Sequence, residues 1–138
     1  MKKELIHQTN TRVRFSEVDS MGVVWHGNYI RYFEDGREAF GDHYGISYLD
    51  FYRQGILIPV VKVECDYKFI LEYGDSITIE TKFVNSEAAK ILYEYRIFKN
   101  NKVVATGKST QVFMNESREL MLNAPEFFLD WKKKNGLI

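Results

Sequence analysis

A long amphipathic segment near the N-terminus constrains the fold of this 138-residue chain more than any other feature. Over residues 28–44, bulky side chains recur every three or four positions, which predicts one helix with a single packed stripe. The stripe consists of Tyr29, Ile30, Phe33, Arg37, Phe40 and Tyr44. Gly36 and Gly41 each weaken a helix by roughly 1 kcal/mol relative to Ala. We therefore expect another part of the backbone, such as a sheet wrapped around the helix, to approach them closely.

From Val60 onward, the sequence alternates with the period of a strand. Apolar residues occupy every second position from Val61 to Phe69 and charged residues lie between them, which predicts one dry and one solvated face. Asn100-Asn101 suits a two-residue hairpin, because Asn tolerates positive φ. Gly107 is expected at a bend or bulge. The further expected elements are strands over 76–85, 90–99 and 102–115, and short helices over 47–54 and 125–135.

These elements predict an α+β domain. A strand that opens at Val13 is followed by the long helix, a short helix, four strands joined by short turns and a terminal helix. We expect the four strands to form an antiparallel meander and the first strand to join the same sheet, with the helices gathered on one face. No Pro-rich linker, repeat or low-complexity tract divides the sequence, so a single domain over 1–138 is expected.

The composition argues against several classes of function. Nineteen basic residues balance nineteen acidic ones, so there is no excess of positive charge for binding nucleic acid. The single cysteine, Cys65, favours a reducing compartment, and no signal peptide or run of ~18 apolar residues is found, so we expect a cytoplasmic protein without a membrane span. No Cys/His cluster has metal-ligand spacing, and no glycine-rich phosphate loop is present, so neither a metal nor a cofactor is expected.

Asp19 is the candidate for chemistry. It begins the turn Asp19-Ser20-Met21-Gly22, about one loop before the expected start of the helix. A helix N-terminus offers unpaired backbone N–H groups and a partial positive charge of roughly half a unit. An acid placed there could attack a carbonyl while these groups hold the oxyanion. The alternative is turn chemistry, in which the carboxylate accepts a hydrogen bond from the backbone two residues on. On the residues alone, the turn is the simpler explanation.

The segment from Asp19 to Tyr29, DSMGVVWHGNY, resembles the active-site segment of hotdog-fold acyl-CoA thioesterases of the 4-hydroxybenzoyl-CoA thioesterase-like subgroup. The shared pattern is Asp, two residues, Gly, a small apolar run, an aromatic, a His or aromatic, one residue, Asn and Tyr. The wider resemblance covers about 11–115. It implies an antiparallel five-stranded curled sheet wrapped around one long central helix. It also implies a homodimer that pairs edge to edge with the active site at the interface, and further assembly into a tetramer.

The resemblance implies hydrolysis of an acyl-CoA thioester to free acid and CoA, with CoA entering as part of the substrate. Asp19 takes the role of nucleophile or general base, and a backbone N–H of His26 or a direct neighbour polarises the carbonyl. The His26 imidazole either lines the site or takes part in acid–base chemistry. Asn28 is expected to cap the helix, and Trp25 either lines the acyl chain or packs in the core. The expected substrate contacts are Gly22, Val23, Val24, Trp25, Asn28, Tyr29, Val61, Lys62 and Lys90.

One departure from the resembling subgroup leaves the acyl donor open. Ala88 and Ala89 stand where relatives can carry paired arginines against the CoA phosphates, so Lys90 is the basic residue that remains there. An acyl carrier protein is therefore an alternative to CoA as the donor. Outside enzymes, the alternative is a non-catalytic acyl-CoA-binding module. A hotdog dehydratase or hydratase needs a His and a carboxylate in a different motif, which this sequence lacks.

Overall fold

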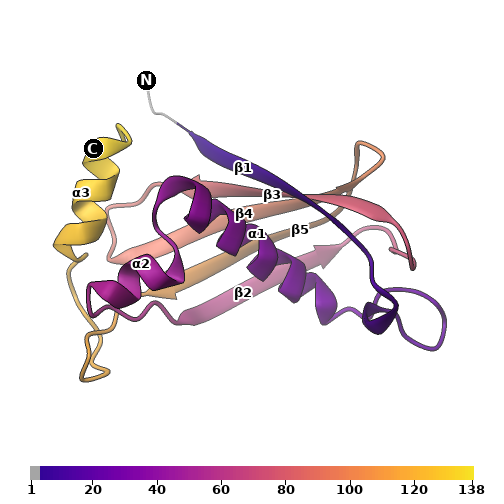
Figure 1. The fold of residues 1–138 in the computed structure, drawn as a ribbon, viewed down its shortest axis with the longest axis horizontal. Helices are drawn as coiled ribbons and strands as arrows, with labels where there is room; N and C mark the ends of the chain where they lie inside the picture. Colours follow the sequence, from indigo (N-terminus) through magenta and orange to yellow (C-terminus); the bar gives the residue numbers. More distant parts are fainter. Residues whose placement is uncertain (1–3) are drawn as a thin grey trace.

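Five strands form one antiparallel sheet in the computed structural model, which describes residues 4–138. Their order across the sheet is β1-β3-β4-β5-β2 (Figure 1), so β1 and β2 form its two edges. The strands are β1 (Leu5–Arg12), β2 (Val60–Tyr67), β3 (Ser76–Val84), β4 (Lys90–Lys99) and β5 (Lys102–Val112). Both asparagines of the β4–β5 hairpin have positive φ, at 51° and 63°, as their sequence predicts. The predicted α+β class and five-stranded sheet are confirmed.

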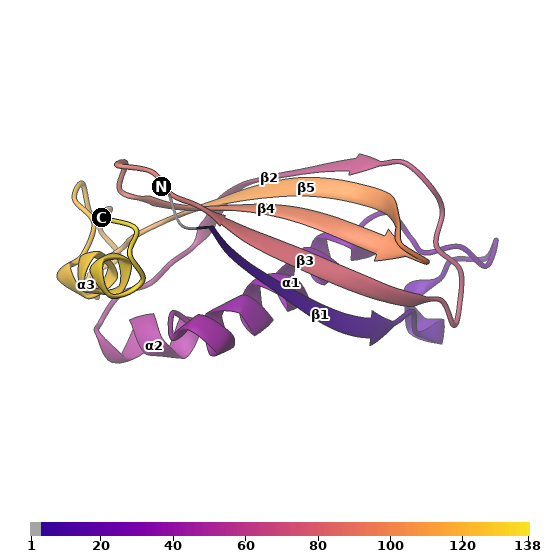
Figure 2. The same cartoon turned by 90° about the horizontal axis from the view of Figure 1, so that it is seen from above.

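One long helix lies along one face of this sheet (Figure 2) and supplies the centre of the core. The helices are the 3-10 helix η1 (Phe15–Glu17), α1 (Asn28–Tyr44), α2 (Tyr48–Arg53) and α3 (Glu126–Lys134). The ring of Phe33 on α1 stacks on Tyr95 of β4 with centroids 4.6 Å apart. Gly45 ends α1 with φ 79°, a conformation that favours glycine. The long helix and the two short helices predicted from the sequence are confirmed.

Two glycines let the helix and the sheet approach this closely. A Cβ on Gly36 would overlap the Thr81 side chain on β3, so the sheet does approach this glycine closely, through side chains and not through the backbone as predicted. A Cβ on Gly107 would overlap the ring of Phe33, so Gly107 leaves space for α1. No bulge lies at Gly107, because the register of β4 and β5 shifts elsewhere, at 97–98.

The first strand lies earlier in the chain than the sequence predicts. β1 ends at Arg12, whereas the prediction began the strand at Val13. The Val13 N–H donates to the Asp75 carbonyl at 2.9 Å, and the chain then turns into η1. The Arg14 N–H donates to the Glu17 carboxylate at 2.8 Å, which fixes this turn. Asp19 therefore follows a short helix and the isolated bridge residue Val18, not the end of a strand.

The strand β2 is exposed on both faces, which corrects two expectations. It pairs with β5 on one side only, so β3, β4 and β5 form the meander and β2 lies at the edge. The predicted dry face is not covered: Val61 is 58% exposed and Val63 is 39% exposed. A long edge strand with exposed apolar side chains is a template for pairing with another chain.

Two histidines join β1 to the C-terminal part of α1 and make stability depend on pH. The rings of His7 and His43 stack with centroids 4.6 Å apart. Burial, followed by the charge of His43, lowers the pKa of His7 from its ordinary value of 6.5. The unfolded chain then binds protons more readily than the folded chain. The stability that depends on a neutral His7 is therefore fully present above about pH 6.5 and falls as the pH drops below that value. We expect a lower Tm at about pH 5.5 than at about pH 7.5.

Thermal melts of the wild type and of His7→Gln at the two pH values check this expectation. The variant lacks the titrating imidazole, so its Tm should change less with pH. Equal changes in Tm for both proteins would show that other groups cause the pH dependence.

Candidate active site

Asp19 lies at the head of a tight turn between η1 and α1. Its N–H donates to the Val23 carbonyl at 2.8 Å, and the Gly22 N–H donates to the Asp19 carbonyl at 3.0 Å. Gly22 has φ +78°, which favours glycine at this position. The Asp19 carboxylate accepts a hydrogen bond from the Met21 N–H at 2.8 Å through Oδ1. The turn chemistry considered from the sequence is therefore present, and it orients a half-buried carboxylate while using one of its two oxygens.

The start of α1 presents backbone N–H groups that lack acceptors. Gly27 is the N-cap of α1, and within residues 4–138 no hydrogen bond satisfies the N–H of His26 or of Gly27. The Trp25 ring lies directly over Gly27, where any Cβ would overlap the indole. Trp25 is 52% exposed, so plain core packing does not describe it. Free N–H groups at a helix N-terminus favour a negatively charged oxygen.

Glu17 joins the Asp19 turn to the start of α1. Its carbonyl accepts hydrogen bonds from the Trp25 N–H at 3.0 Å and from Asn28 Nδ2 at 2.9 Å. Its carboxylate accepts a hydrogen bond from the Tyr32 hydroxyl at 3.0 Å. The capping role expected for Asn28 is wrong, because Asn28 is the first residue of α1 and its amide turns back to Glu17. The sequence patterns did not single out Glu17.

Tyr67, at the end of β2, is a site residue that the sequence patterns missed. Its hydroxyl donates to the His26 carbonyl at 2.9 Å, and its ring packs edge to face on Tyr29 with centroids 4.9 Å apart. Burial, followed by the charge of Cys65, raises the pKa of Tyr67 to about 12, so the phenol remains a donor at neutral pH. The His26 carbonyl and the Gly27 N–H belong to one planar peptide unit. Tyr67 therefore fixes the direction of the Gly27 N–H.

We expect Tyr67→Phe to lower kcat about fivefold, because the lost hydrogen bond contributes roughly 1 kcal/mol and frees the peptide plane. Tyr67 is 49% exposed, so the Tm should change little. Steady-state kinetics and thermal melts of the variant check this. Tyr52→Phe on α2 removes the hydroxyl of another exposed tyrosine away from the site and serves as the matched control. A wild-type kcat for Tyr67→Phe would contradict a role in positioning this peptide.

The other predicted residues near the turn divide between core and surface. Val24 is buried, and its N–H donates to the Leu71 carbonyl at 2.8 Å. Val23 is half-buried and forms an isolated β-bridge with Glu72. Tyr29 is buried on α1 with its hydroxyl 3.5 Å from the Phe69 carbonyl, so it supports the site from below. These contacts tie the Asp19 turn to the loop that follows β2.

Three predicted residues lie farther from Asp19 within one chain. Val61 is exposed on β2, at the point where the register of β2 against β5 shifts. The ammonium of Lys62 pairs with Glu64 at 3.0 Å. Lys90 begins β4 opposite Val112, at the end of the sheet away from the Asp19 turn. Nine residues of strand correspond to roughly 30 Å, so a role for Lys90 at this site stays a prediction that requires a second chain.

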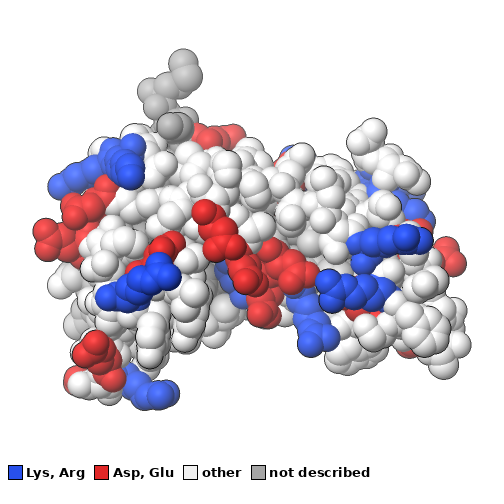
Figure 3. Space-filling model, in the orientation of Figure 1, with Lys and Arg blue, Asp and Glu red and all other residues white. Residues whose placement is uncertain are grey.

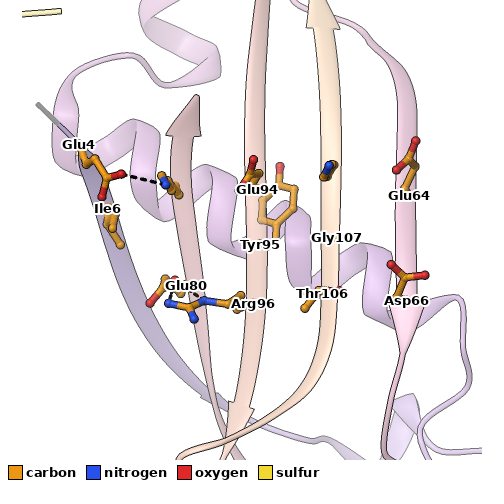
Figure 4. A pocket seen from close by; sticks show the side chains of 12 residues that line it. Glu4, Ile6, Glu64, Asp66, Glu80, Glu94, Tyr95, Arg96, Thr106 and Gly107 are labelled. Atoms are coloured by element: carbon orange, nitrogen blue, oxygen red, sulfur yellow. Dashed lines mark hydrogen bonds and ion pairs between the residues drawn. The ribbon is translucent and has the colours of Figure 1, made fainter. Parts of the chain in front are cut away.

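An acidic region on one face of the molecule and a charged hollow on the other contain none of the residues of the Asp19 turn. Figure 3 shows acidic side chains across the middle of the helical face, where α1 exposes Glu34, Asp35, Glu38 and Asp42. On the opposite face of the sheet, a hollow of about 440 Å³ is lined by charged side chains of both signs (Figure 4). Its ion pairs include Arg96 with Glu80 at 2.7 Å and Lys82 with Glu4 at 3.0 Å. Opposite charges on neighbouring strands are typical of a solvated sheet face.

Neither a metal site nor a membrane-spanning helix is found among residues 4–138. No three His, Cys, Asp or Glu side chains are grouped as a metal ion would require. No helix combines the length and the apolar character needed to cross a bilayer.

A sequence profile described as the thioesterase-like superfamily matches residues 13–132 of this chain. The chain belongs to this superfamily. The thioesterase is 34% identical over 93 residues to the putative acyl-CoA thioesterase YneP of Bacillus subtilis, a match that covers 67% of each chain. Among solved structures, it is similar to a DHNA-CoA thioesterase from Staphylococcus aureus, with 28% identity and a TM-score of 0.85 over 95% of this chain and 89% of that one.

A more distant solved structure supports the hotdog fold of the thioesterase. A mutant 4-hydroxybenzoyl CoA thioesterase complexed with 4-hydroxybenzoyl CoA has a TM-score of 0.79 at 19% identity, covering 91% of this chain and 97% of that one. The family and fold that the Asp19–Tyr29 segment predicted are confirmed, and the protein is a thioester hydrolase. The roles of its individual residues stay predictions.

Proposed function

We propose that this thioesterase hydrolyses an acyl-CoA thioester to the free acid and CoA, using Asp19 and the Gly27 N–H. One observation carries the proposal: an oriented carboxylate and unsatisfied N–H groups at a helix start lie on the same short segment, tied together through Glu17. An acid that attacks and donors that hold the developing oxyanion are the two requirements of acyl transfer.

The chemistry follows from these two groups. The thioester carbonyl oxygen accepts hydrogen bonds from the Gly27 N–H, with the His26 N–H as the second candidate donor, and negative charge develops there as the carbonyl carbon is attacked. Asp19 either removes a proton from the attacking water or attacks directly to form an acyl anhydride that water then cleaves. In both routes the carbon–sulfur bond breaks, the CoA thiolate leaves and takes up a proton, and the acid is released.

The exposed side of β2 supports a second chain as part of the site. Val63 and Tyr67 share this side, are 39% and 49% exposed, and extend the surface formed by the half-exposed Trp25. Two β2 strands paired antiparallel about a two-fold axis would cover these side chains and make one continuous sheet. Such a pair brings the partner's Val60 beside Tyr67. We propose this homodimer as the active form.

The same pairing supplies a place for the acyl group. A cavity of about 410 Å³ lies between α1, α2 and the start of β2 and contains Val60, so the pairing brings the partner's cavity beside Tyr67 and the Asp19 turn. Its apolar walls include Leu49 and Ile58, and Arg37, Tyr93 and Gln111 add polar groups. This combination supports a medium-length or aromatic acyl group with a polar substituent.

Hydrolysis of a panel of thioesters by the purified protein tests the proposal. The panel contains aliphatic acyl-CoA esters of increasing length, an aromatic and a hydroxyaromatic acyl-CoA, and an acyl carrier protein thioester. Release of free thiol, followed by a colour reagent, measures turnover. Catalytic release from at least one CoA ester supports the proposal. Binding of CoA without release from any ester would identify a non-catalytic binding module and overturn it.

A further inference from the structure

Two exposed aromatic rings and two arginines surround a hollow where β1 runs into η1. The hollow has a volume of about 370 Å³ and is lined by Thr11, Arg12, Val13, Arg14, Phe15 and Tyr73. Phe15 is 77% exposed and Tyr73 is 60% exposed, and their rings meet edge to face with centroids 5.9 Å apart. Large exposed aromatic rings beside guanidinium groups are the combination that stacks a nucleobase and binds its phosphates.

The Arg12 guanidinium is held in place beside Tyr73. Its Nε donates to the Gly74 carbonyl at 3.2 Å, which leaves the two terminal nitrogens for another acceptor. Within residues 4–138, Arg12 and Arg14 form no ion pair with a carboxylate. A guanidinium fixed through Nε presents a fork that matches a phosphate group. Arg14 lies nearer to acidic neighbours, since its charge opposes the upward shift that burial gives the pKa of Asp35.

Arg12 also borders a second, polar hollow on its other side. This hollow has a volume of about 520 Å³ and is lined by Asn10, Thr11, Arg12, Ser76, Ile77, Thr78, Phe98, Asn100 and Asn101. Hydroxyl and amide groups of this kind suit a ribose and the remaining phosphate oxygens. An aromatic hollow, a fixed guanidinium and a polar hollow therefore lie side by side along the end of β1.

The distribution of charge keeps an anion away from the middle of α1. The exposed face of α1 is acidic there, and basic side chains lie on both sides of this acidic region, including the end where β1 meets η1 (Figure 3). A phosphate group is repelled by the first region and attracted by the second. The hollow lies beside β1, so pairing through β2, at the opposite edge of the sheet, leaves it open.

We propose that Arg12, Arg14, Phe15 and Tyr73 form a subsite for the adenine nucleotide of coenzyme A, so that CoA and not a carrier protein is the acyl donor. The proposal rests on the proposed thioesterase function. Phe15 lies four residues before Asp19, a separation of at most ~14 Å even for a fully extended chain. The pantetheine arm has roughly the length of four extended residues, so it can join the thioester at Asp19 to a nucleotide in this hollow.

The kinetics of two thioesters with the same acyl group test the subsite. Acyl-CoA carries the nucleotide, and the S-acyl-N-acetylcysteamine ester lacks it. We expect Phe15→Ala and Arg12→Ala each to raise the KM for acyl-CoA about tenfold, with kcat unchanged and with the KM for the short ester unchanged. Phe15→Ala removes an exposed ring and tests the site even if Arg12→Ala weakens the turn at Gly74. Lys108→Ala, which removes one cation from the opposite sheet face, is the control and should change neither KM.

One further variant should restore part of the affinity for acyl-CoA, and three results would contradict the subsite. Arg12→Lys keeps the charge and loses the fork, so it should recover part of the lost affinity for acyl-CoA. Unchanged KM values for acyl-CoA in both alanine variants overturn the subsite, and so does an equal rise for both esters, which would mark a structural effect on the Asp19 turn. A rise confined to an acyl carrier protein thioester also overturns it. Failure of the thioesterase function itself would appear separately, as no hydrolysis of the short ester by the wild type.

Discussion

Asp19→Asn should lower kcat for acyl-CoA hydrolysis about 10³-fold, because the amide can neither attack a carbonyl nor remove a proton from water. The fold should survive the change. The Asn side chain has the same shape, and its amide oxygen can replace Oδ1 as acceptor for the Met21 N–H at 2.8 Å. The Asx turn and the position of Gly22 are therefore retained. Thiol release measures kcat, and a thermal melt measures stability.

The matched control for this change is Asp130→Asn, which removes an exposed carboxylate on α3. Its turnover should equal that of the wild type. If Asp19→Asn also retained wild-type turnover, the carboxylate would serve only the turn. Loss of both turnover and Tm in Asp19→Asn would likewise point to a structural role for Asp19.

Val63→Glu should convert the dimer that we propose to monomers and abolish most of the activity. In one chain this side chain is already 39% exposed, so the monomer loses little packing and should stay folded. In a two-fold pair the substitution occurs twice across the seam, which places two carboxylates where apolar side chains would meet. Burying such charges without partners costs several kcal/mol. We expect at least a 100-fold loss of kcat/KM, because each site loses the surface that the second chain supplies.

Ile6→Glu is the control for the proposed interface between two β2 strands, the β2 seam. Ile6 has the same 39% exposure and lies on β1, the opposite edge of the sheet. Analytical ultracentrifugation of both variants gives the mass in solution. A monomer for Val63→Glu and a dimer for Ile6→Glu support the β2 seam. The reverse result would move the interface to β1 and separate it from Tyr67 and the start of α1.

The elements of the fold could be predicted because they depend on local periodicity. The stripe that includes Phe33 and Phe40 identified α1, and alternation from Val61 to Phe69 identified β2. What covers an apolar face is not a local property. The strand order places β2 at the edge beyond β5. Val61 and Val63 alternate with charged residues, and this pattern is the same whether the same chain or a second chain covers the apolar side chains.

The site was predictable only where its geometry is local. Asp19, two residues and Gly22 form a turn whose hydrogen bonds span at most four residues. The role of Asn28 depends on the carbonyl of Glu17, eleven residues away, and an Asn beside Gly27 carries the same signal whether it caps the helix or begins it. Tyr67 reaches the His26 carbonyl across 41 residues, so only the folded chain identifies it as a site residue.

The composition of β1 has a consequence for how far assembly can proceed. From His7 to Arg12 this strand carries only polar side chains, whereas the corresponding side of β2 is apolar. A chain with an apolar edge strand on both sides of its sheet would polymerise into a ribbon of unlimited length. Because only β2 has an apolar edge, the β2–β2 pair that we propose would end lateral growth of the sheet at ten strands, twice the five of one chain.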